Sequence, residues 1–503
     1  MEHNKFLMAI DIGTTSVKCL VIDENGKIIA TSSHSYPIYN PAPSWVEQQP
    51  EDWWDAVISS IKDCLQAVDA KAIAGISFSG HMSALVLVDE KGTPLHPSIL
   101  IADTRSSQQT SYLRTHYMKQ FLESTGNEPI DAFTVSKLMW VKEEKPDVLN
   151  KTTKFLFPKD YVRLQLTSKM GTDPTDAGNS LLYHLQKADW NWELIHELDL
   201  PPSIFPDLIG TTEIFGYVTK QAAALTGLQE GTPVITGGAD MACSHIGTGA
   251  IQEETMVITL STSGQVVTSI PAPHEQGIGK VTFHPGASAN SMYTMGTIFT
   301  GGLGVEWGYK FLFNKQEMKP VDYDELNRLT ERMKDYPPGS NGLLFLPFLV
   351  GSGTPYFDPK DRASWIGLTL NQDKALLLHS ILEGITFNLL ENINVMKAME
   401  IPMKNVFLGA GGSKNPVWCQ MIADVLGIDV ALLTNRDGSA LGAAIIAGVG
   451  VGLFPSIEKA VSSLIRTDAP IFYQPDNHQT YKKLFEGYQD VYQSLNRYQK
   501  IYS

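Results

Sequence analysis

At 503 residues and 55.4 kDa, the chain is too long for one ordinary hydrophobic core, so we expect two large domains. Hydrophobic residues make up 43% and charged residues 18%, which is ordinary globular composition and excludes extended disorder. The formal net charge of -15 disfavours nucleic acid and anionic membranes as partners, because both need a basic face.

Cysteine usage and hydropathy indicate where the protein works. The 4 cysteines lie far apart, without a CxxC pair or a histidine at metal-ligand spacing, so we expect neither a disulfide framework nor a zinc site. The N-terminus lacks a signal-peptide pattern, and the longest apolar stretch, at 441–453, is too short for a bilayer span. We therefore expect a cytoplasmic protein with no membrane and no nucleic acid among its partners; a homodimer is left open.

The first predicted elements are strands. Apolar runs at 6–12 and 17–22 are separated by the turn GTTS, and a second turn at 24–26 leads into a third strand. This order is typical of an antiparallel meander.

A helix is predicted to begin at Pro50, with Glu51 and Asp52 at its positive end. Its apolar residues repeat every three or four positions, at Trp54, Val57, Ile58, Ile61, Leu65 and Val68. Strands at 72–80 and 84–89 follow, and strands then alternate with helices through the first half of the chain.

The segment 255–272 resembles a second copy of 9–26, displaced by about half the chain length. Chance similarity of two short Thr/Ser-rich hairpins is the alternative. A repeat at this offset favours two related domains that meet at a cleft. We assign residues 1–248 to the N-terminal domain and 249–503 to the C-terminal domain.

The second half has its own helices. Residues 375–399 form a strong predicted helix, with one apolar face made of Ile381, Leu382, Ile385, Leu389 and Leu390. An apolar strand at 406–412 runs into another helix near Pro416.

Asp11 lies at the turn of the first hairpin, where a carboxylate can hold magnesium. Gly13 lets the backbone approach phosphate oxygens, Thr14 and Thr15 offer hydroxyl and amide donors, and Lys18 can reach the same anion. An ordinary polar turn explains the same residues equally well. The second hairpin offers the same donors at Thr262, Ser263 and Gly264, and two such hairpins facing one cleft are hard to explain as turns.

Asp240 follows an apolar strand and a Gly-Gly-Ala turn, which places it at the carboxyl end of a strand, where ligands gather in α/β sheets. An aspartate there can accept the proton of an attacking hydroxyl. Capping of the next helix is the alternative.

The small-residue segment at 438–444 is interpreted as mainly structural, because such residues suit close helix packing.

The loop at 409–413 joins a buried strand to a helix N-terminus, and its glycines, Gly411 and Gly412 among them, leave room for a nucleotide. Close packing of helix and strand also selects glycine, so this signal is weak by itself.

These segments together resemble the FGGY carbohydrate kinases, most nearly the xylulokinase branch, over essentially the whole chain. The motifs are DIGTTSVK, WVEQQPEDWW, FPKDYVRLQLTS, DPTDAGNS, GGADMA, LSTSG, LEGITFNLL, GAGGSKNPVWCQMIADVLG and GSALGAA, in that order.

The resemblance implies an α/β fold with two actin-like, ribonuclease-H-type domains around a central cleft for ATP and sugar. It also implies an ATP- and Mg²⁺-dependent kinase that phosphorylates a hydroxyl of a small keto-sugar or polyol. Asp240 would then be the general base, and Asp11 would assist magnesium and phosphate. The resemblance further places Thr14, Thr15 and Thr262 against phosphates, and Gly411, Gly412 and Asn415 near the adenosine.

Departures from the xylulokinase pattern cluster where the sugar would bind. The usual GQMHG is Gly80-His81-Met82-Ser83-Ala84, the usual WNDGR is 101–105 with only Asp103 and Arg105 kept, and Met241 replaces an asparagine. We expect the sugar-pocket residues to be His81, Met82, Ser83, Asp103, Arg105 and Met241. We expect D-xylulose to be at best one of several substrates, because each replacement removes a donor, an acceptor or a stacking surface.

Several alternatives stay open. His81 can be a satisfied histidine at a strand end, and Asp103 with Arg105 can be a surface ion pair. A sugar-sensing pseudokinase has the same architecture, although keeping both Asp11 and Asp240 argues against it. Within the family, a gluconate or other polyol kinase is the further alternative.

Overall fold

The predicted meander forms one side of a seven-stranded sheet in the computed structural model, which describes residues 5–315 and 323–499. Its order is β11-β12-β5-β1-β2-β3, and β13 also pairs with β5. β1 and β2 are antiparallel, whereas β1 and β5 are parallel, so β1 is a buried central strand. The strands are β1 (Phe6–Ile12), β2 (Ser16–Ile22), β3 (Ile28–Ser35), β5 (Ile73–Gly80), β11 (Ile214–Tyr217), β12 (Pro233–Ile235) and β13 (Gly238–Ala239).

One face of this sheet packs against α1 (Pro50–Cys64), α5 (Pro158–Thr167) and α8 (Lys220–Thr226). α1 begins at the predicted proline, and Val57 and Ile61 of the predicted apolar face are fully buried. Trp54 is half-buried and packs against the same hydrophobic cluster. Sequence reasoning missed Trp53, which is fully buried and whose Nε1 donates to Gln48 Oε1 at 3.0 Å.

A second hydrophobic cluster lies beside this sheet and holds the rest of the N-terminal half. Its helices are α2 (Ser107–Thr125), α3 (Thr134–Glu144), α4 (Pro146–Lys151), α6 (Pro174–Asn179) and α7 (Trp192–Glu197). Its short strands are β4 (Glu47–Gln48), β6 (Val86–Val88), β7 (Ser98–Ile99), β8 (Lys154–Leu156), β9 (Tyr183–His184) and β10 (Asp189–Trp190).

The second predicted hairpin lies in a six-stranded sheet with the order β16-β17-β15-β14-β20-β21. β14 is antiparallel to β15 and parallel to β20, which repeats the pairing of β1 with β2 and β5. Asp11 lies opposite Ser79, and Thr259 lies opposite Gly409 in the matching parallel pair. The strands are β14 (Thr255–Leu260), β15 (Gly264–Ile270), β16 (Thr282–Pro285), β17 (Met292–Ile298), β20 (Asn405–Gly409) and β21 (Ala431–Leu432).

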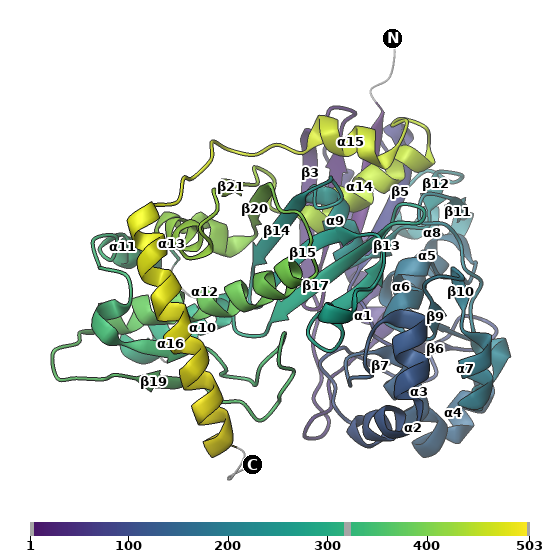
Figure 1. Cartoon of the computed structure of the whole chain (residues 1–503). Coiled ribbons are helices and arrows are strands. Elements are labelled where there is room, and N and C mark those ends of the chain that lie inside the picture. Colours follow the sequence, from purple (N-terminus) through teal and green to yellow (C-terminus); the bar gives the residue numbers. More distant parts are fainter. Residues whose placement is uncertain (1–4, 316–322, 500–503) are drawn as a thin grey trace.

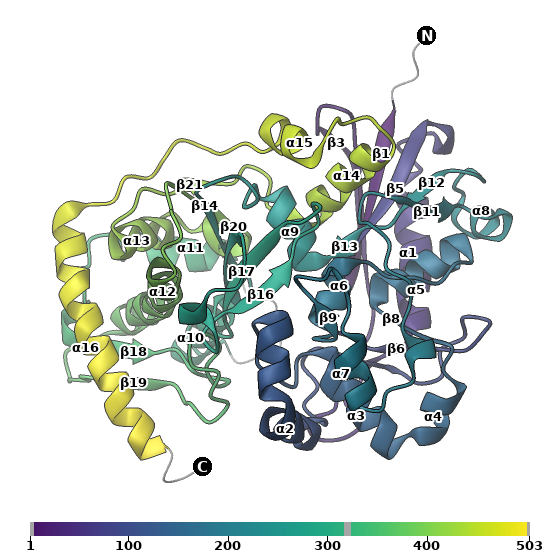
Figure 2. The same cartoon turned by 45° about the vertical axis from the view of Figure 1, so that its right-hand side comes forward.

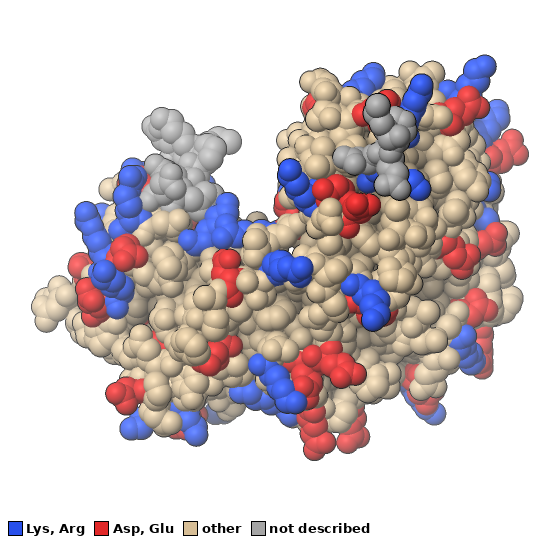
Figure 3. Space-filling model, turned by 90° about the horizontal axis from the view of Figure 1, so that it is seen from above, with Lys and Arg blue, Asp and Glu red and all other residues tan. Residues whose placement is uncertain are grey.

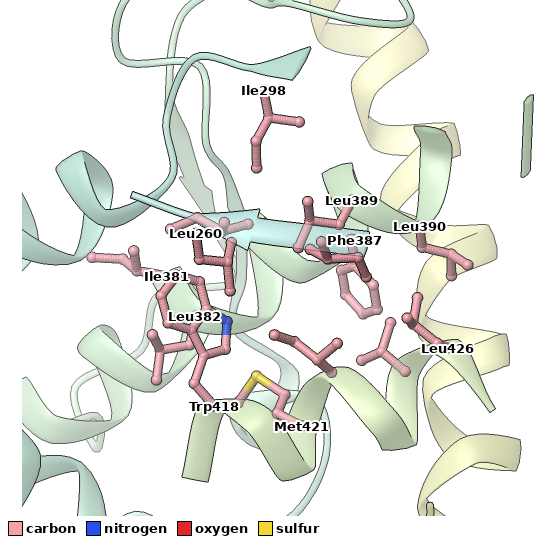
Figure 4. Close-up of a cluster of buried hydrophobic side chains, with 14 of the residues drawn as sticks. Leu260, Ile298, Ile381, Leu382, Phe387, Leu389, Leu390, Trp418, Met421 and Leu426 are labelled. Atoms are coloured by element: carbon pink, nitrogen blue, oxygen red, sulfur yellow. The ribbon is translucent and has the colours of Figure 1, made fainter. Parts of the chain in front are cut away.

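Helices cover the outer face of this second sheet, and Figure 4 shows how the apolar side chains of α12 and α13 meet those of the strands. The five residues predicted for the apolar face of α12 are all buried. The elements are α10 (Gly302–Leu312), α11 (Tyr323–Glu331), α12 (Lys374–Ala398), α13 (Pro416–Leu426) and α16 (Pro475–Gln499), with β18 (Leu344–Leu346) and β19 (Ser364–Ile366).

α9 (Asp240–Gly247) and α14 (Gly438–Gly450) lie between the two sheets, and α15 (Ile457–Leu464) packs beside them at the top of the view, as Figures 1 and 2 show. One hydrophobic cluster joins residues of β1, such as Leu7 and Ala9, with residues of β14 and β15, such as Val257 and Val267. α14 and α15 thus belong to the second half of the chain but pack against the first sheet. The predicted division at residue 248 stays a proposal about chain organisation.

α9 and α14 touch closely because glycines face one another. A Cβ atom at Gly247 would stand 1.9 Å from the carbonyl oxygen of Gly438, and one at Gly442 would stand 1.8 Å from that of Cys243. The structural interpretation of 438–444 is therefore confirmed in part, since Ser439 has a further role described below.

Seen from above, the surface is notched between two lobes, and acidic and basic side chains are interspersed on this face (Figure 3).

No helix in the described part of the chain is long and apolar enough to cross a membrane.

Candidate active site

Asp11 is the last but one residue of the central strand β1 and points to the side of the sheet that carries α14. Ser439 Oγ donates to Asp11 Oδ2 at 2.7 Å. Burial raises the pKa of Asp11, while the hydroxyl groups of Ser439 and Ser79 and the charge of Lys18 act in the opposite direction. Asp11 Oδ1 is buried and accepts no hydrogen bond from any described residue. A buried carboxylate oxygen left in this state is suited to a cation.

Two side chains fix the turn after Asp11 through its backbone carbonyl groups, which leaves the threonine side chains of the turn exposed. Tyr36 donates to the carbonyl oxygen of Gly13, and Gln48 Nε2 donates to that of Thr14 at 2.7 Å. Thr14 and Thr15 themselves are exposed. The predicted donors are therefore available to a ligand, whereas Tyr36 and Gln48, which fix the turn, carry no local sequence signal.

Lys18 forms an ion pair with Asp437, and its Nζ lies 2.5 Å from Asp437 Oδ1. Both side chains are partly exposed. The expectation that Lys18 contacts a phosphate stays a prediction. It requires Lys18 either to leave Asp437 or to contact Asp437 and the phosphate together.

Asp240 is the first residue of α9 and follows β13, so both the strand-end prediction and the helix-start alternative describe its position. Burial first, and the nearby charge of Asp11 second, raise the pKa of Asp240 to about 7. The backbone amide of Met241 donates to Asp240 Oδ1 at 2.7 Å, and the amide of Met82 also favours its charged form. The fold thus brings the two predicted catalytic carboxylates, Asp11 and Asp240, close enough to interact electrostatically.

The second hairpin rests on the start of α10. The amide of Gly301 donates to the carbonyl of Thr262 at 3.1 Å, and that of Gly302 donates to Ser261 at 2.6 Å. A Cβ atom at Gly301 would stand 2.5 Å from the backbone of Ser263. These two glycines were missed by sequence reasoning, since a Gly-Gly pair before a helix has many ordinary causes.

Ser263 directly precedes the returning strand of this hairpin, which begins at Gly264. Gln265 Nε2 donates to Ser263 Oγ at 2.7 Å, and Gly264 lies opposite Ile298, whose side chain would meet a Cβ atom at 2.8 Å. Packing therefore explains why position 264 is glycine, and its role toward a nucleotide stays a prediction.

The two glycines of the loop after β20 differ in their surroundings. A Cβ atom at Gly412 would stand 2.6 Å from Leu260 Cβ, so close packing requires glycine there. At Gly411 the nearest atom would be the carbonyl oxygen of Leu260 at 3.9 Å, so packing does not require glycine, and the exposed backbone leaves room for a ligand. Asn415 caps α13 through the amide of Trp418 and donates to Thr330 Oγ1 of α11 at 2.8 Å.

The predicted sugar residues at the end of β5 point in different directions. The ring of His81 packs edge-on against Trp53 at 5.5 Å, and burial lowers its pKa to about 4. Neither ring nitrogen has a hydrogen-bond partner among the described residues. Met82 lies instead in the cluster between the sheets, with Met241 and Ile101 packed against that cluster. Ser83 is buried, and its hydroxyl donates to the carbonyl of Asn179 at 3.4 Å.

Asp103 and Arg105 are 0% and 1% exposed as side chains, so the alternative of a surface ion pair is wrong. Arg105 Nη2 lies 2.7 Å from Asp103 Oδ2, and Arg105 Nη1 lies 2.8 Å from Glu47 Oε1. The guanidinium is stacked 3.8 Å from the ring centre of Trp45. Contact between this buried pair and a sugar stays a prediction.

The comparisons with known proteins agree with this geometry. The chain matches the N-terminal domain of the FGGY family of carbohydrate kinases over residues 6–247 and the family's C-terminal domain over residues 256–451. It is 35% identical over 490 residues to a xylulose kinase of Bacillus subtilis, covering 97% of each chain.

Two solved structures from Lactobacillus acidophilus, a gluconate kinase and a ligand-bound xylulose kinase, each match with a TM-score of 0.92 and 26% identity. Each match covers 99% of this chain and 100% of the other. The predicted class, an α/β fold with two actin-like domains, is confirmed. The chain belongs to the FGGY family of carbohydrate kinases and is a sugar kinase.

Proposed function

We propose that this kinase moves the γ-phosphoryl group of ATP onto a hydroxyl of a small keto-sugar or polyol, with Asp240 as the general base. The observation that carries the proposal is the environment of Asp240, a carboxylate with a pKa of about 7 at the start of α9. A base is most effective when its pKa lies near the working pH. The substrate hydroxyl gives its proton to Asp240 while its oxygen bonds to the γ-phosphorus, and the bond to the β–γ bridging oxygen breaks to release ADP.

Asp11 suits a magnesium ion, because one of its oxygens is buried without an alternative hydrogen bond. A bound magnesium ion would neutralise charge that develops on the transferred phosphoryl group. Ser439 fixes the other oxygen of Asp11, so that the carboxylate keeps one orientation.

The nucleotide is proposed to span both halves of the chain. Thr14 and Thr15 offer hydroxyl and amide donors from one hairpin, and Thr262 offers them from the other. The backbone at Gly411 has room for the adenosine, and the amides at the start of α13 lie beyond it.

The sugar pocket is proposed to be more apolar than a pocket built for D-xylulose. Met82, Ile101 and Met241 share one hydrophobic cluster, and the hydroxyl of Ser83 is used within the protein. We therefore propose a xylulokinase-like enzyme for which D-xylulose is one of several substrates. Its relatives include proteins named xylulose kinase and gluconokinase, which makes a gluconate or other polyol kinase the second candidate. A cytoplasmic location is also proposed, from the pattern of cysteines.

A coupled ADP-release assay tests the function directly. The panel is pentuloses, hexuloses, pentitols, aldonates and glycerol, each with wild type and with Asp240→Asn. Wild type should turn over at least one compound, and Asp240→Asn should reduce kcat by about two decades or more while ATP binding, measured by calorimetry, is kept. Near-wild-type turnover in Asp240→Asn would contradict the assignment of Asp240 as the base. Sugar binding without turnover in the wild type would favour the sugar-sensing pseudokinase.

A further inference from the structure

A fully buried group of charged side chains lies directly behind the loop that carries Asp240. Lys159 Nζ lies 2.6 Å from Asp160 Oδ1, 2.5 Å from Asp173 Oδ2 and 2.8 Å from Asp176 Oδ2. All four side chains are at most 1% exposed. The three carboxylates have metal-ligand spacing, but the ammonium group of Lys159 already occupies the position of a cation.

The cluster also holds Arg163, whose Nη2 lies 2.8 Å from Asp160 Oδ1. Burial, ahead of the neighbouring carboxylates, raises the pKa of Asp176 well above its ordinary value. Three carboxylates thus face two cations in one buried group. Such a group is costly to disturb by removing one member, which makes it a rigid support.

Two hydrogen-bonded chains lead from this support to the catalytic loop. The first runs from Lys159 to Asp173, then to Thr175, whose hydroxyl donates to Asp173 Oδ1. The hydroxyl oxygen of Thr175 accepts the backbone amide of Ala239 at 2.8 Å, and Ala239 precedes Asp240 directly.

The second chain holds the other end of the loop, because Arg163 Nη1 donates to the carbonyl of Thr236 at 2.5 Å. Between the two anchors, Gly237 has a φ of 80°, and a Cβ atom there would stand 2.4 Å from the carbonyl oxygen of Phe78. The loop from Thr236 to Ala239 is thus fixed at both ends and pressed against β5 in the middle.

We infer that Thr175 is a positioning residue that sets the place of Asp240 relative to the sugar hydroxyl, with Asp173 and Lys159 holding Thr175 in turn. The inference rests on the proposed role of Asp240 as the base. Thr175 has no direct part in the chemistry. Its loss lets the amide of Ala239 move, and small displacements of a base are expensive because proton transfer needs hydrogen-bond distance.

Thr175→Val tests the inference, since valine keeps the shape and removes the hydroxyl. We expect kcat to fall by about tenfold to a hundredfold, while KM for ATP and for the best sugar of the panel changes by less than about threefold. Thr175→Ser keeps the hydroxyl and should restore most of kcat. A structural residue alone would lower the melting temperature without this split between kcat and KM.

Thr226→Val is the matched control. Thr226 is equally buried, donates to the carbonyl of Ala222 at 2.7 Å and accepts the amide of Leu228 at 3.2 Å, but it lies on α8, away from the loop. The Thr226→Val variant should lower the melting temperature about as much as Thr175→Val does, and it should leave kcat unchanged. If Thr175→Val does not fold, Thr175→Ala gives the same comparison with a smaller side chain.

A double variant separates failure of this inference from failure of the proposed function. If Thr175 acts through Asp240, then Thr175→Val combined with Asp240→Asn should be no slower than Asp240→Asn alone. Unchanged kcat in Thr175→Val, or additive losses in the double variant, would overturn the positioning role while the base assignment stands. Unchanged kcat in Asp240→Asn would instead overturn the proposed role of Asp240 as the base.

Discussion

Ser439 donates a 2.7 Å hydrogen bond to Asp11, although the two residues are 428 positions apart in the chain. The contact exists because α14, from the second half of the chain, packs against the first sheet through its glycines. The site around Asp11 is therefore completed by a helix near the opposite end of the sequence.

Ser439→Ala should weaken magnesium dependence. Hydrogen bonds to charged groups contribute about 1.5–3 kcal/mol, so the magnesium concentration for half-maximal activity should rise about tenfold or more. Magnesium titrations of ADP release measure this. Ser463→Ala is the control, because the Ser463 hydroxyl bonds only the carbonyl of Ala460 within α15 in the described structure. An unchanged titration would leave Ser439 with a packing role alone.

Asp11→Ala should reduce turnover and the response to magnesium together, because the proposed ligand is removed. Asp23→Ala, at the far end of the same hairpin, removes a half-buried aspartate that closes a turn. That control should keep the wild-type magnesium titration. If Asp11→Ala also keeps it, Asp11 is a turn former and nothing more.

Substrate preference should follow the apolar wall of the pocket. We expect kcat/KM for some compound of the panel to exceed that for D-xylulose by at least about tenfold, or about 1.4 kcal/mol of transition-state binding. Met241→Asn returns the amide that the xylulokinase pattern has, and it should shift the ratio toward D-xylulose. A clear preference of the wild type for D-xylulose would contradict the predicted pocket and leave the kinase assignment intact.

Stability should depend on pH through a buried glutamate of α12. Burial raises the pKa of Glu391 from 4.5 to about 7, against the hydrogen bonds that Tyr356 and Asn388 donate to it. The folded state therefore binds its proton more tightly than the unfolded state. This contribution to stability is complete below pH 4.5 and is lost as pH rises to about 7.

Glu391→Gln replaces the protonated carboxyl by a neutral amide, so the loss of stability with rising pH should disappear in this variant. The melting temperature of wild type should therefore fall relative to the variant by about 2–4 °C or more between pH 5 and pH 8. Glu486→Gln, on the exposed side of α16, is the control and should run parallel to wild type. Parallel curves for all three proteins would show that Glu391 is ionised in the folded state throughout this range.

Local patterns in the sequence were sufficient for the elements with strong periodicity and clear ends. The first meander begins and ends within a residue or so of its prediction, because apolar runs and a Gly-Thr turn specify strands locally. α12 was predicted almost to its ends, since its apolar residues recur with helical spacing over 25 residues. Asp11 and Asp240 could be chosen from their places at strand ends.

Tertiary structure decided what depends on partners far away in the chain. Trp53 joined the core although the helical repeat did not include it, because its indole finds an acceptor on Gln48. Asp103 and Arg105 became a buried pair, since Glu47 and Trp45 from another segment enclose them. Sequence reasoning treated 438–444 as packing alone, yet Ser439 meets Asp11 only when α14 crosses to the first sheet. Periodicity reports which face of an element is apolar, whereas hydrogen-bond partners brought together by folding have no fixed spacing that a sequence could display.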